Sequence, residues 1–347
     1  MEQRRLGKTL RVWLLALLAA LLAACTPASE AGNPVQTAIA ATLTARPFST
    51  PPTATEVPPT PTPTFEPGGR PRGKIVYVCQ YSKQSGRNQI CIMNADGSDP
   101  RTLTQGGQYD DFFPSITPDG QYVLFVSDRT GRYQIYEYEL ATDQLTQLTE
   151  FNNISAYAPT ASPDGRWIVF YAILDGQQYP ASHNIWSMRR DGSGALQLTQ
   201  RRGGGWDPVW SPDSARILFA SETNGFPQLF MINADGSQTR QVTDLSGLRG
   251  RNDWSVDGLL ATYLGSSWDR DIYVFDTNGE NVVQLTDGGN NLAPSFSPDG
   301  HWLTFMSYRD NPRQDLGCEI YVMRVDGSDA RRLTTNDICD WQPRWGP

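Results

Sequence analysis

The sequence predicts an all-β fold, a six-bladed β-propeller over residues 73–347, and two repeated elements carry this prediction. A 15-residue element that closes on threonine occurs six times, with its closing threonines 45, 50, 44, 43 and 48 residues apart. Its copies occupy residues 90–104, 135–149, 185–199, 229–243, 272–286 and 320–334. A turn of the type Ser-Pro-Asp-Gly occurs five times, at residues 117–120, 162–165, 211–214, 255–258 and 297–300. Four short antiparallel strands in roughly 45 residues are typical of one propeller blade.

Each repeat is interpreted as four strands in a fixed order. The first strand ends at the Ser-Pro-Asp-Gly turn, where proline presets φ and glycine takes the left-handed position. An alternating apolar run such as residues 122–127 is the second strand. A polar loop then leads to the third strand, such as residues 272–275. A tight Asp-Gly or Asn-Gly turn, such as Asp96-Gly97, leads to the fourth strand.

The two ends of residues 73–347 predict how the ring closes. Residues 73–79 match a second strand, but no first strand precedes them. Residues 340–346 match the first strand of a repeat, and the sequence then stops. We therefore expect the C-terminal strand to complete the N-terminal blade, which removes an exposed sheet edge.

The N-terminal residues are typical of an exported protein. Four basic residues precede an apolar run at residues 12–24, which is too short to span a bilayer but suits the core of a secretion signal. The run ends in Leu-Ala-Ala-Cys, which resembles a bacterial lipobox and predicts lipidation of Cys25. An ordinary cleaved signal peptide and an uncleaved membrane helix are the alternatives.

Residues 25–72 are expected to be a tether. Eleven of the 47 residues from 26 to 72 are proline and ten are threonine, a composition that cannot bury a core. Such a segment is expected to be disordered and extended at about 3.1 Å per residue. The predicted division is therefore a lipoprotein signal at residues 1–24, a lipidated linker at 25–72 and the propeller at 73–347.

Besides Cys25, four cysteines remain, and an even count in an exported protein suggests disulfides. Cys79 and Cys91 lie on neighbouring strands of one predicted blade. Cys318 starts the third strand of the last predicted blade and Cys339 lies in the loop after its fourth strand, so both lie on one side of the predicted ring. We expect the pairs Cys79–Cys91 and Cys318–Cys339, with four buried thiols as the alternative. No Cys-x-x-Cys spacing supports a zinc site.

These repeats resemble the TolB-type propeller family, which is built of WD40-like (PD40) repeats with the Ser-Pro-Asp-Gly signature. The resemblance covers residues 73–347, with Ser214, Val256 and Asn252 as local departures from the glycine, proline and proline of other blades. It implies a periplasmic, non-enzymatic propeller that binds protein partners; TolB itself binds the peptidoglycan-associated lipoprotein.

Charge and motifs narrow the possible chemistry. The formal net charge is −8, and because residues 1–24 contribute +3, the remainder carries −11. An acidic body repels phosphate backbones, so we expect no nucleic-acid partner. Two histidines occur, without a Gly-x-Ser-x-Gly or His-Glu-x-x-His pattern. We expect no catalytic residue, no metal and no cofactor.

Several pairs of carboxylates are interpreted as solvated loop charge, with a calcium site or a glycosidase pair as alternatives. The pairs are Asp110 with Asp111, Asp269 with Asp271, and Asp340 with Glu319.

Four aromatic residues share one slot in the loops that join consecutive blades, two residues before the proline of the blade. Together with neighbouring polar residues they are expected to surround one mouth of the central channel and to bind a ligand, with burial between blades as the alternative. The candidate binding residues are Asp111, Phe112, Tyr157, Trp206, Asp207, Arg251, Asn252, Asn291, Asp340 and Trp341.

The sequence thus predicts a monomeric, lipid-anchored extracytoplasmic propeller that faces the periplasm or the cell exterior. Its expected role is a non-catalytic binding platform for a protein or a cell-wall component. The alternative is a glycan lyase or hydrolase with its site in the channel. Such an enzyme needs a histidine–metal cluster or a hydrolase domain, and the sequence indicates neither.

Overall fold

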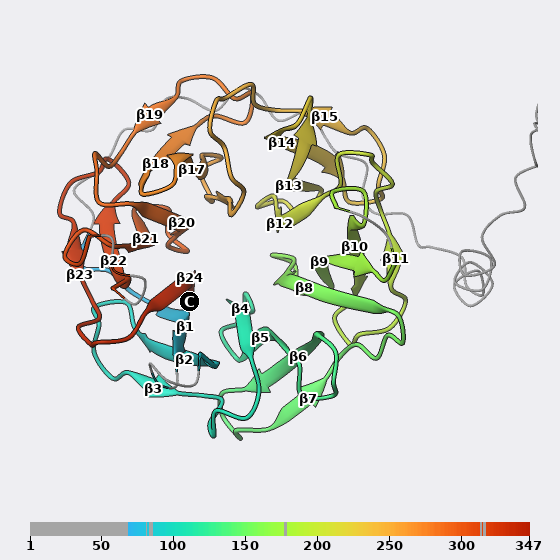
Figure 1. The fold of residues 1–347 in the computed structure, drawn as a ribbon, viewed down its shortest axis with the longest axis horizontal. Helices are drawn as coiled ribbons and strands as arrows, with labels where there is room; N and C mark the ends of the chain where they lie inside the picture. The colour runs from blue at the N-terminus through green and yellow to red at the C-terminus, as the bar shows by residue number, and fades with distance from the viewer. Residues whose placement is uncertain (1–68, 81, 83–85, 177–178, 313, 315–316) are drawn as a thin grey trace, which may run out of the picture. The chain divides into compact units, whose positions relative to one another are not determined.

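The computed structural model describes residues 69–347, apart from residues 81, 83–85, 177–178, 313 and 315–316. Within these residues, 24 strands form six four-stranded antiparallel sheets, and the sheets are arranged as a ring around a central axis (Figure 1). The predicted all-β, six-bladed propeller is confirmed. The predicted secretion signal, Cys25 and nearly all of the predicted tether lie outside the described residues.

In the description of each blade below, the strand given first lies at the central channel and the strand given last lies at the periphery (Figure 1). Blade one consists of β24 (Asp340–Gly346), β1 (Lys74–Gln80), β2 (Asn88–Asn94) and β3 (Arg101–Thr102). Blade two consists of β4 (Asp111–Ile116), β5 (Tyr122–Ser127), β6 (Gln134–Glu139) and β7 (Leu145–Gln147). Blade three consists of β8 (Ile154–Ala161), β9 (Trp167–Leu174), β10 (His183–Arg189) and β11 (Leu196–Gln197).

The other three blades repeat this order. Blade four consists of β12 (Trp206–Trp210), β13 (Arg216–Thr223), β14 (Phe226–Asn233) and β15 (Arg240–Gln241). Blade five consists of β16 (Asp253–Trp254), β17 (Leu260–Ser266), β18 (Asp269–Phe275) and β19 (Val283–Gln284). Blade six consists of β20 (Asn291–Phe296), β21 (Trp302–Ser307), β22 (Glu319–Arg324) and β23 (Arg331–Arg332).

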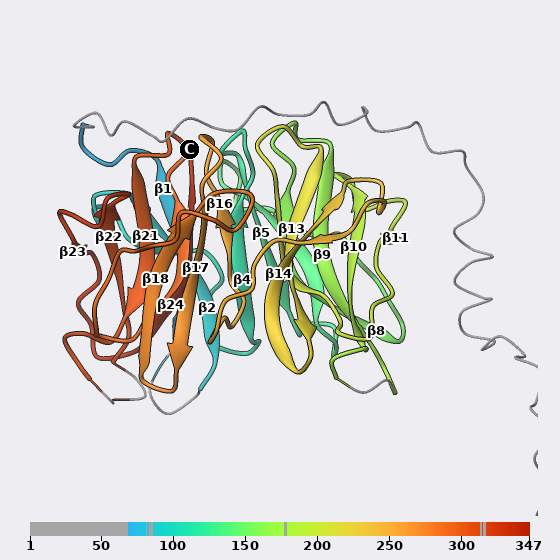
Figure 2. The same cartoon turned by 90° about the horizontal axis from the view of Figure 1, so that it is seen from above.

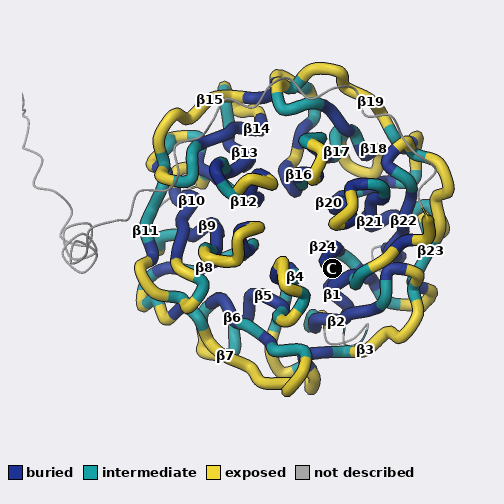
Figure 3. The backbone as a smooth tube through the Cα atoms, turned by 180° about the vertical axis from the view of Figure 1, so that it is seen from behind, coloured by how far each residue is buried: buried dark blue, intermediate teal, exposed yellow. Residues whose placement is uncertain are grey.

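The second and third strands of each blade are buried on both faces, because each face packs against a neighbouring blade (Figure 3). Along β1, Tyr77 packs in a cluster with Ile320 of blade six, whereas Val76 packs in a cluster with Phe125 of blade two. Successive side chains of a strand point to opposite faces of its sheet. This alternation between two apolar neighbours explains why these strands are nearly continuous hydrophobic runs in the sequence.

The threonine that closes each repeat has a structural role in every blade. Its hydroxyl accepts a hydrogen bond from the backbone N–H of the residue 14 positions earlier, at the start of the third strand, at distances of 2.9–3.0 Å. The threonines are Thr104, Thr149, Thr199, Thr243, Thr286 and Thr334. This bond ties the end of the outermost strand to the third strand, so the same residue recurs at the same place.

The aspartates of the recurring turns act within the turn. The hydroxyl of Ser162 donates to Asp164 at 2.6 Å, and Asp164 also accepts the backbone N–H of Arg166 at 3.1 Å. In the turn of blade four, Ser214 takes the position of glycine with φ of 60°. An asparagine, aspartate or glycine relieves this conformation more readily than serine, so the Ser214 departure costs some stability.

The ring closes through β24, as predicted. β24 pairs antiparallel with β1, with Lys74 opposite Gly346 and Cys79 opposite Asp340. The indole Nε1 of Trp345 on β24 donates to the backbone carbonyl of Arg72 at 2.8 Å. The two ends of the propeller therefore support each other within one sheet.

Both predicted disulfides are present. Cys79 and Cys91 lie within blade one with their Cα atoms 5.9 Å apart, and Cys318 and Cys339 join blade six to the residue before β24 with Cα atoms 4.6 Å apart. The first pair is diagonal rather than directly opposite, because Cys79 lies across from Gln89 in the register. The four half-cystines share one buried cluster at the closure.

The ring has two unlike faces (Figure 2). We call "mouth face" the side formed by the loops between consecutive blades and by the loops between second and third strands. The other side, the "turn face", carries the Ser-Pro-Asp-Gly turns and the turns before the outermost strands. The C-terminus lies on the turn face, and Gly73, which precedes β1, contacts Gly346 there. No helix in the described part of the chain is long and apolar enough to cross a bilayer.

Candidate site at the mouth face and the central channel

Five of the six innermost strands carry a bulge near the mouth face, and in blade five the equivalent position lies just before β16. The residue at this position is not glycine, yet it has a positive φ between 48° and 54° in all six blades. These residues are Phe113, Ala158, Asp207, Arg251, Ala293 and Gln342. A bulge redirects a side chain relative to a regular strand, and six repetitions of a sparsely populated conformation mark it as a built feature.

Several bulge side chains meet across the channel. The guanidinium of Arg251 in blade five lies over the ring of Phe113 in blade two, the opposite blade, at 5.0 Å. The backbone N–H of Phe113 donates to Oε1 of Gln342 in blade one at 2.9 Å. The backbone N–H of Arg251 donates to Oδ2 of Asp207 in blade four at 2.9 Å. These contacts connect residues of neighbouring and opposite blades within the channel.

The six polar residues predicted at the mouth are all buried. Asp111 forms an ion pair with Arg129 at 3.1 Å. Asn252 donates to the backbone carbonyl of Asp207 at 3.0 Å, which joins blades four and five. The buried set is Asp111, Asp207, Arg251, Asn252, Asn291 and Asp340. They belong to the inner wall of the ring, and their predicted role in binding stays a prediction.

The interpretation of the paired carboxylates as solvated loop charge is wrong for four of them. Asp111, Asp271, Glu319 and Asp340 are all buried. Glu319 accepts the hydroxyl of Thr334 at 2.6 Å, and Asp271 accepts that of Thr286 at 2.7 Å. These carboxylates lie at the start of a third strand or of a first strand, where their oxygen atoms accept hydrogen bonds inside the ring. The sequence analysis placed them in loops and therefore did not predict their burial.

Asp340 lies in an unusual electrostatic position. The equivalent residues of blades two and six are contacted by an arginine, since Arg129 pairs with Asp111 and Arg309 donates to Asn291 at 3.0 Å. Asp340 instead accepts the amide of Asn336 at 2.6 Å. Burial, with a further contribution from Glu319, raises the pKa of Asp340 to about 7. Burial also raises the pKa of Glu319.

The four predicted aromatic residues are partly buried and lie at the junctions between blades. Phe112, Tyr157 and Trp206 belong to one row of ring contacts across blades two to four, with neighbouring centroids 5.2–6.1 Å apart. The row runs through Phe112, Tyr157, Tyr171, His183, Tyr179 and Trp206. Trp341 is separate, and its Nε1 donates to Asn88 at 3.3 Å.

The sequence analysis missed the most exposed aromatic residues. Among the described residues, four large aromatic side chains are exposed, at 39–67% of their surface, and all four lie on the mouth face. They are Tyr109, Tyr179, Phe226 and Trp268. The large aliphatic side chains that are exposed lie instead in turn-face turns or on outermost strands, at Leu145, Val256, Val282 and Val283. Their positions in loops of the mouth face could have indicated these exposed aromatic residues. They do not recur at equivalent positions of several blades, as Phe112, Tyr157, Trp206 and Trp341 do, and were therefore missed.

One histidine of the described residues lies beside a hydroxyl group. Nδ1 of His183 lies 2.9 Å from the hydroxyl of Ser182, a neighbour that the sequence analysis did not identify. Ser182 is only 2% exposed, so its hydroxyl is not open to a substrate. Burial lowers the pKa of His183. No group of three or more His, Cys, Asp or Glu residues in the described ranges is arranged to hold a metal ion.

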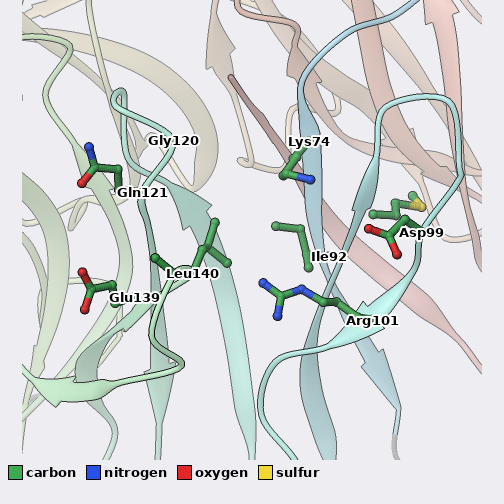
Figure 4. Close-up of a pocket in the computed structure, with 10 residues that line it drawn as sticks. Lys74, Ile92, Asp99, Arg101, Gly120, Gln121, Glu139 and Leu140 are labelled. Carbon is green, nitrogen blue, oxygen red and sulfur yellow. The ribbon is translucent and has the colours of Figure 1, made fainter.

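A groove of about 370 Å³ lies on the turn face between blades one and two. Figure 4 shows Lys74 and Arg101 on one wall and Gln121 and Glu139 on the other. Lys74 donates to Asn94 at 3.0 Å and Arg101 pairs with Asp143 at 3.5 Å, so both cations already have a partner. Because both signs of charge line the groove, its electrostatics favour no particular ligand.

Fold and site together define a disulfide-bonded β-propeller with an aromatic mouth face. The model of the PD40 family, described as the TolB beta propeller domain, matches residues 55–181 and 139–267. The chain belongs to this TolB-type propeller family.

Individual relatives agree with this assignment. A TolB homolog of Chlorobium luteolum is 36% identical over 138 residues, which is 38% of this chain and 31% of that protein. The matches span only 29–46% of the length of the curated relatives.

Solved structures agree on the fold. TolB from Acinetobacter baumannii superposes with a TM-score of 0.68 at 25% identity, over 79% of this chain and 67% of that one. An oligogalacturonate lyase in complex with manganese superposes with a TM-score of 0.53 at 19% identity, over 76% of this chain and 74% of that one. The likeness to the lyase concerns the fold alone.

Proposed function

We propose that this protein is a lipid-anchored, extracytoplasmic binding platform that holds a protein or cell-envelope component on its mouth face without catalysing a reaction. The observation that carries the proposal is the confinement of all four exposed large aromatic side chains of the described residues to this face. Exposed aromatic residues supply large contact area at low entropic cost and are enriched where proteins bind partners.

The position of the chain ends supports the choice of face. Arg72 contacts Trp345 on β24, and Gly73 contacts Gly346, so the preceding chain joins the propeller on the turn face. An anchor at Cys25 would reach the propeller through this point. A partner could then approach the mouth face without competing with the attachment.

The composition of the mouth face favours a protein as the partner. The row of ring contacts from Phe112 to Trp206 includes Tyr179, which is 59% exposed, and Phe226 on the mouth face of blade four is 67% exposed. Charged groups are interspersed, since the hydroxyl of Tyr179 donates to Glu222 at 2.7 Å. An aromatic centre with a polar rim matches the anatomy of a transient protein interface.

Photocrosslinking in native membranes tests the binding face. A photoreactive residue replaces Tyr179, Phe226 or Trp268 in turn, and Leu145 on the outermost strand β7 serves as the control position. We expect one discrete crosslinked species from the mouth-face positions and none from Leu145. Crosslinking from Leu145 alone would refute the choice of face.

The anchor is tested separately. Cys25→Ser removes the residue that we propose to be lipidated, so the chain is expected to leave the membrane fraction while the propeller remains folded. Retention of Cys25→Ser in the membrane fraction after a high-salt wash would contradict the proposed lipid anchor.

A further inference from the structure

Arg251 is a buried cation whose side chain is not satisfied by the protein. It is 8% exposed, and its Nε and Nη2 atoms have no hydrogen-bond partner among the described residues. Nearly all buried polar groups in native proteins are hydrogen-bonded, and a buried charge without a partner destabilises the folded state. Such an exception calls for a functional explanation.

The neighbouring groups do not supply the missing partner. Asp207 accepts the backbone N–H of Arg251, but no carboxylate in the described part of the chain lies within 4.0 Å of the guanidinium. The ring of Phe113 covers one face of the guanidinium at 5.0 Å and leaves its edge unoccupied by protein acceptors.

A second arginine makes the channel more positive. Arg344 donates from Nη1 and Nη2 to the backbone carbonyl of Asn252, both at 3.1 Å, and pairs with Asp253 at 3.3 Å. Burial, followed by repulsion from Arg344, lowers the pKa of Arg251 to about 10. The guanidinium therefore stays charged at neutral pH. Arg344 has partners and Arg251 does not, although the whole protein is acidic.

The two unpartnered atoms define the geometry of the missing group. Nε–H and Nη2–H point from the same edge of the planar guanidinium, as two parallel donors. A carboxylate matches this edge with its two oxygens and forms a bidentate pair. Aromatic rings lie nearby, because the guanidinium lies over Phe113, whose ring centroid is 6.3 Å from that of Tyr157 and 6.2 Å from that of Tyr171.

We propose that Arg251 is the receptor for a carboxylate of the polypeptide bound on the mouth face, either an acidic side chain or a free C-terminus. This inference rests on the proposed function, since it names the group of the partner that enters the channel. Alongside the carboxylate, an apolar or aromatic side chain packs against the rings of Phe113 and Tyr157.

Small carboxylates with uncharged counterparts test the proposal directly. The probes are N-acetyl-L-tryptophan for a chain terminus, N-acetyl-L-aspartic acid α-amide for a side chain, and N-acetyl-L-tryptophan amide as the uncharged control. The readout is the Nε–Hε signal of Arg251 in NMR spectra of the full chain in detergent micelles, assigned by its loss in Arg251→Gln. We expect a saturable shift with at least one acid, bound at least tenfold more tightly than the amide.

A matched variant separates a local site from general charge. Arg202→Gln removes the same charge from an exposed position in a mouth-face loop. Acid binding is expected to persist in Arg202→Gln and to fall at least tenfold in Arg251→Gln by calorimetric titration. Equal binding of acid and amide, acid binding that survives Arg251→Gln, or no shift with any probe would overturn the proposal.

The two acids also identify the source of the carboxylate. A stronger response to N-acetyl-L-tryptophan assigns a C-terminus, and a stronger response to the aspartate derivative assigns a side chain. Failure of Arg251 to bind acids leaves the mouth-face crosslinks unaffected. Conversely, acid binding without any mouth-face crosslink would refute the binding platform and retain the Arg251 site.

Discussion

Removal of the Cys318–Cys339 disulfide is expected to loosen the closure of the ring without opening it. The bridge joins two residues 21 positions apart and attaches the residue before β24 to the residue before β22. The chain-entropy relation gives about 3.3 kcal/mol for a loop of that size at 25 °C. For a domain of residues 73–347 this free energy corresponds to a decrease in Tm of about 6 °C.

The fold survives this change because β24 has other contacts. It is paired with β1 along its length, and Trp345 and Trp341 each donate a hydrogen bond, to Arg72 and to Asn88. Alanine is the suitable replacement, since Cys318 is fully buried and serine would bury an unpaired hydroxyl. The variant is therefore Cys318→Ala with Cys339→Ala.

A second disulfide provides the matched control. Cys79–Cys91 spans 12 positions within blade one, for which the same relation gives about 2.8 kcal/mol. The two double variants should have similar Tm values but differ in local opening. Hydrogen exchange of the β24 amides, relative to those of β12, should accelerate in the Cys318→Ala/Cys339→Ala protein and much less in the other.

Two outcomes would refute the reasoning about closure. One is unchanged exchange of β24 relative to β12 after loss of Cys318–Cys339, since the bridge would then not hold the closing strand. The other is faster exchange of β24 to the same extent in both double variants, since the effect would then be global destabilisation.

Three further predictions concern single sites. Because the pKa of Asp340 is raised in the folded state, the folded protein holds a proton that the unfolded chain releases, and the free energy of unfolding should decrease by at most about 4 kcal/mol as pH rises from about 4 to about 7. Asp340→Asn should flatten this pH dependence, measured by urea unfolding at several pH values. An unchanged pH dependence in Asp340→Asn would contradict the prediction. Gly279→Ala should lower the free energy of unfolding more than Gly288→Ala in urea unfolding. Both glycines have a positive φ, but only at Gly279 would the added Cβ collide with a backbone atom, the carbonyl oxygen of Val242. Equal decreases in the two variants would show that backbone conformation alone matters. The double variant Tyr179→Ala/Phe226→Ala should weaken the crosslink formed from position 268 on the mouth face, with little change in Tm. The core variant Phe125→Ala should instead lower the free energy of unfolding by about 3–5 kcal/mol. A large decrease in Tm in the double variant would show that Tyr179 and Phe226 serve packing.

The fold was predictable because each blade repeats the same local chemistry. Asp164 and its equivalents form turns, and Thr104 and its equivalents close the outermost strand, so period and strand order follow from short-range hydrogen bonds. The unmatched strand at each end of the repeats predicted the β24–β1 pairing. Once strand order was known, the positions of Cys318 and Cys339 relative to the loops predicted their bridge.

The candidate site was predictable only in part, because repetition describes what the blades share and a binding site depends on how they differ. Recurrence of an aromatic residue at the same position in the loops between blades identified Phe112 and Trp206, which lie in one row of ring contacts. It did not predict Tyr179 or Phe226, whose loops differ in length from those of other blades. It also did not indicate that the mouth polar residues are buried, since burial there arises from six strands that converge on one axis.

The same convergence explains why Arg251 stands apart from its equivalents. At the bulge position two blades place alanine, at Ala158 and Ala293, which leaves space near the axis for larger residues. Arg251 and Phe113 extend into that space from opposite blades and meet there. The donor edge of Arg251 is unpaired, so burial of this cation has a free-energy cost that other interactions of the propeller must offset. The two disulfides and the packing between six blades stabilise the fold enough to offset it. The proposed partner would supply the missing acceptor at Nε and Nη2 of Arg251, so binding is expected to remove this cost.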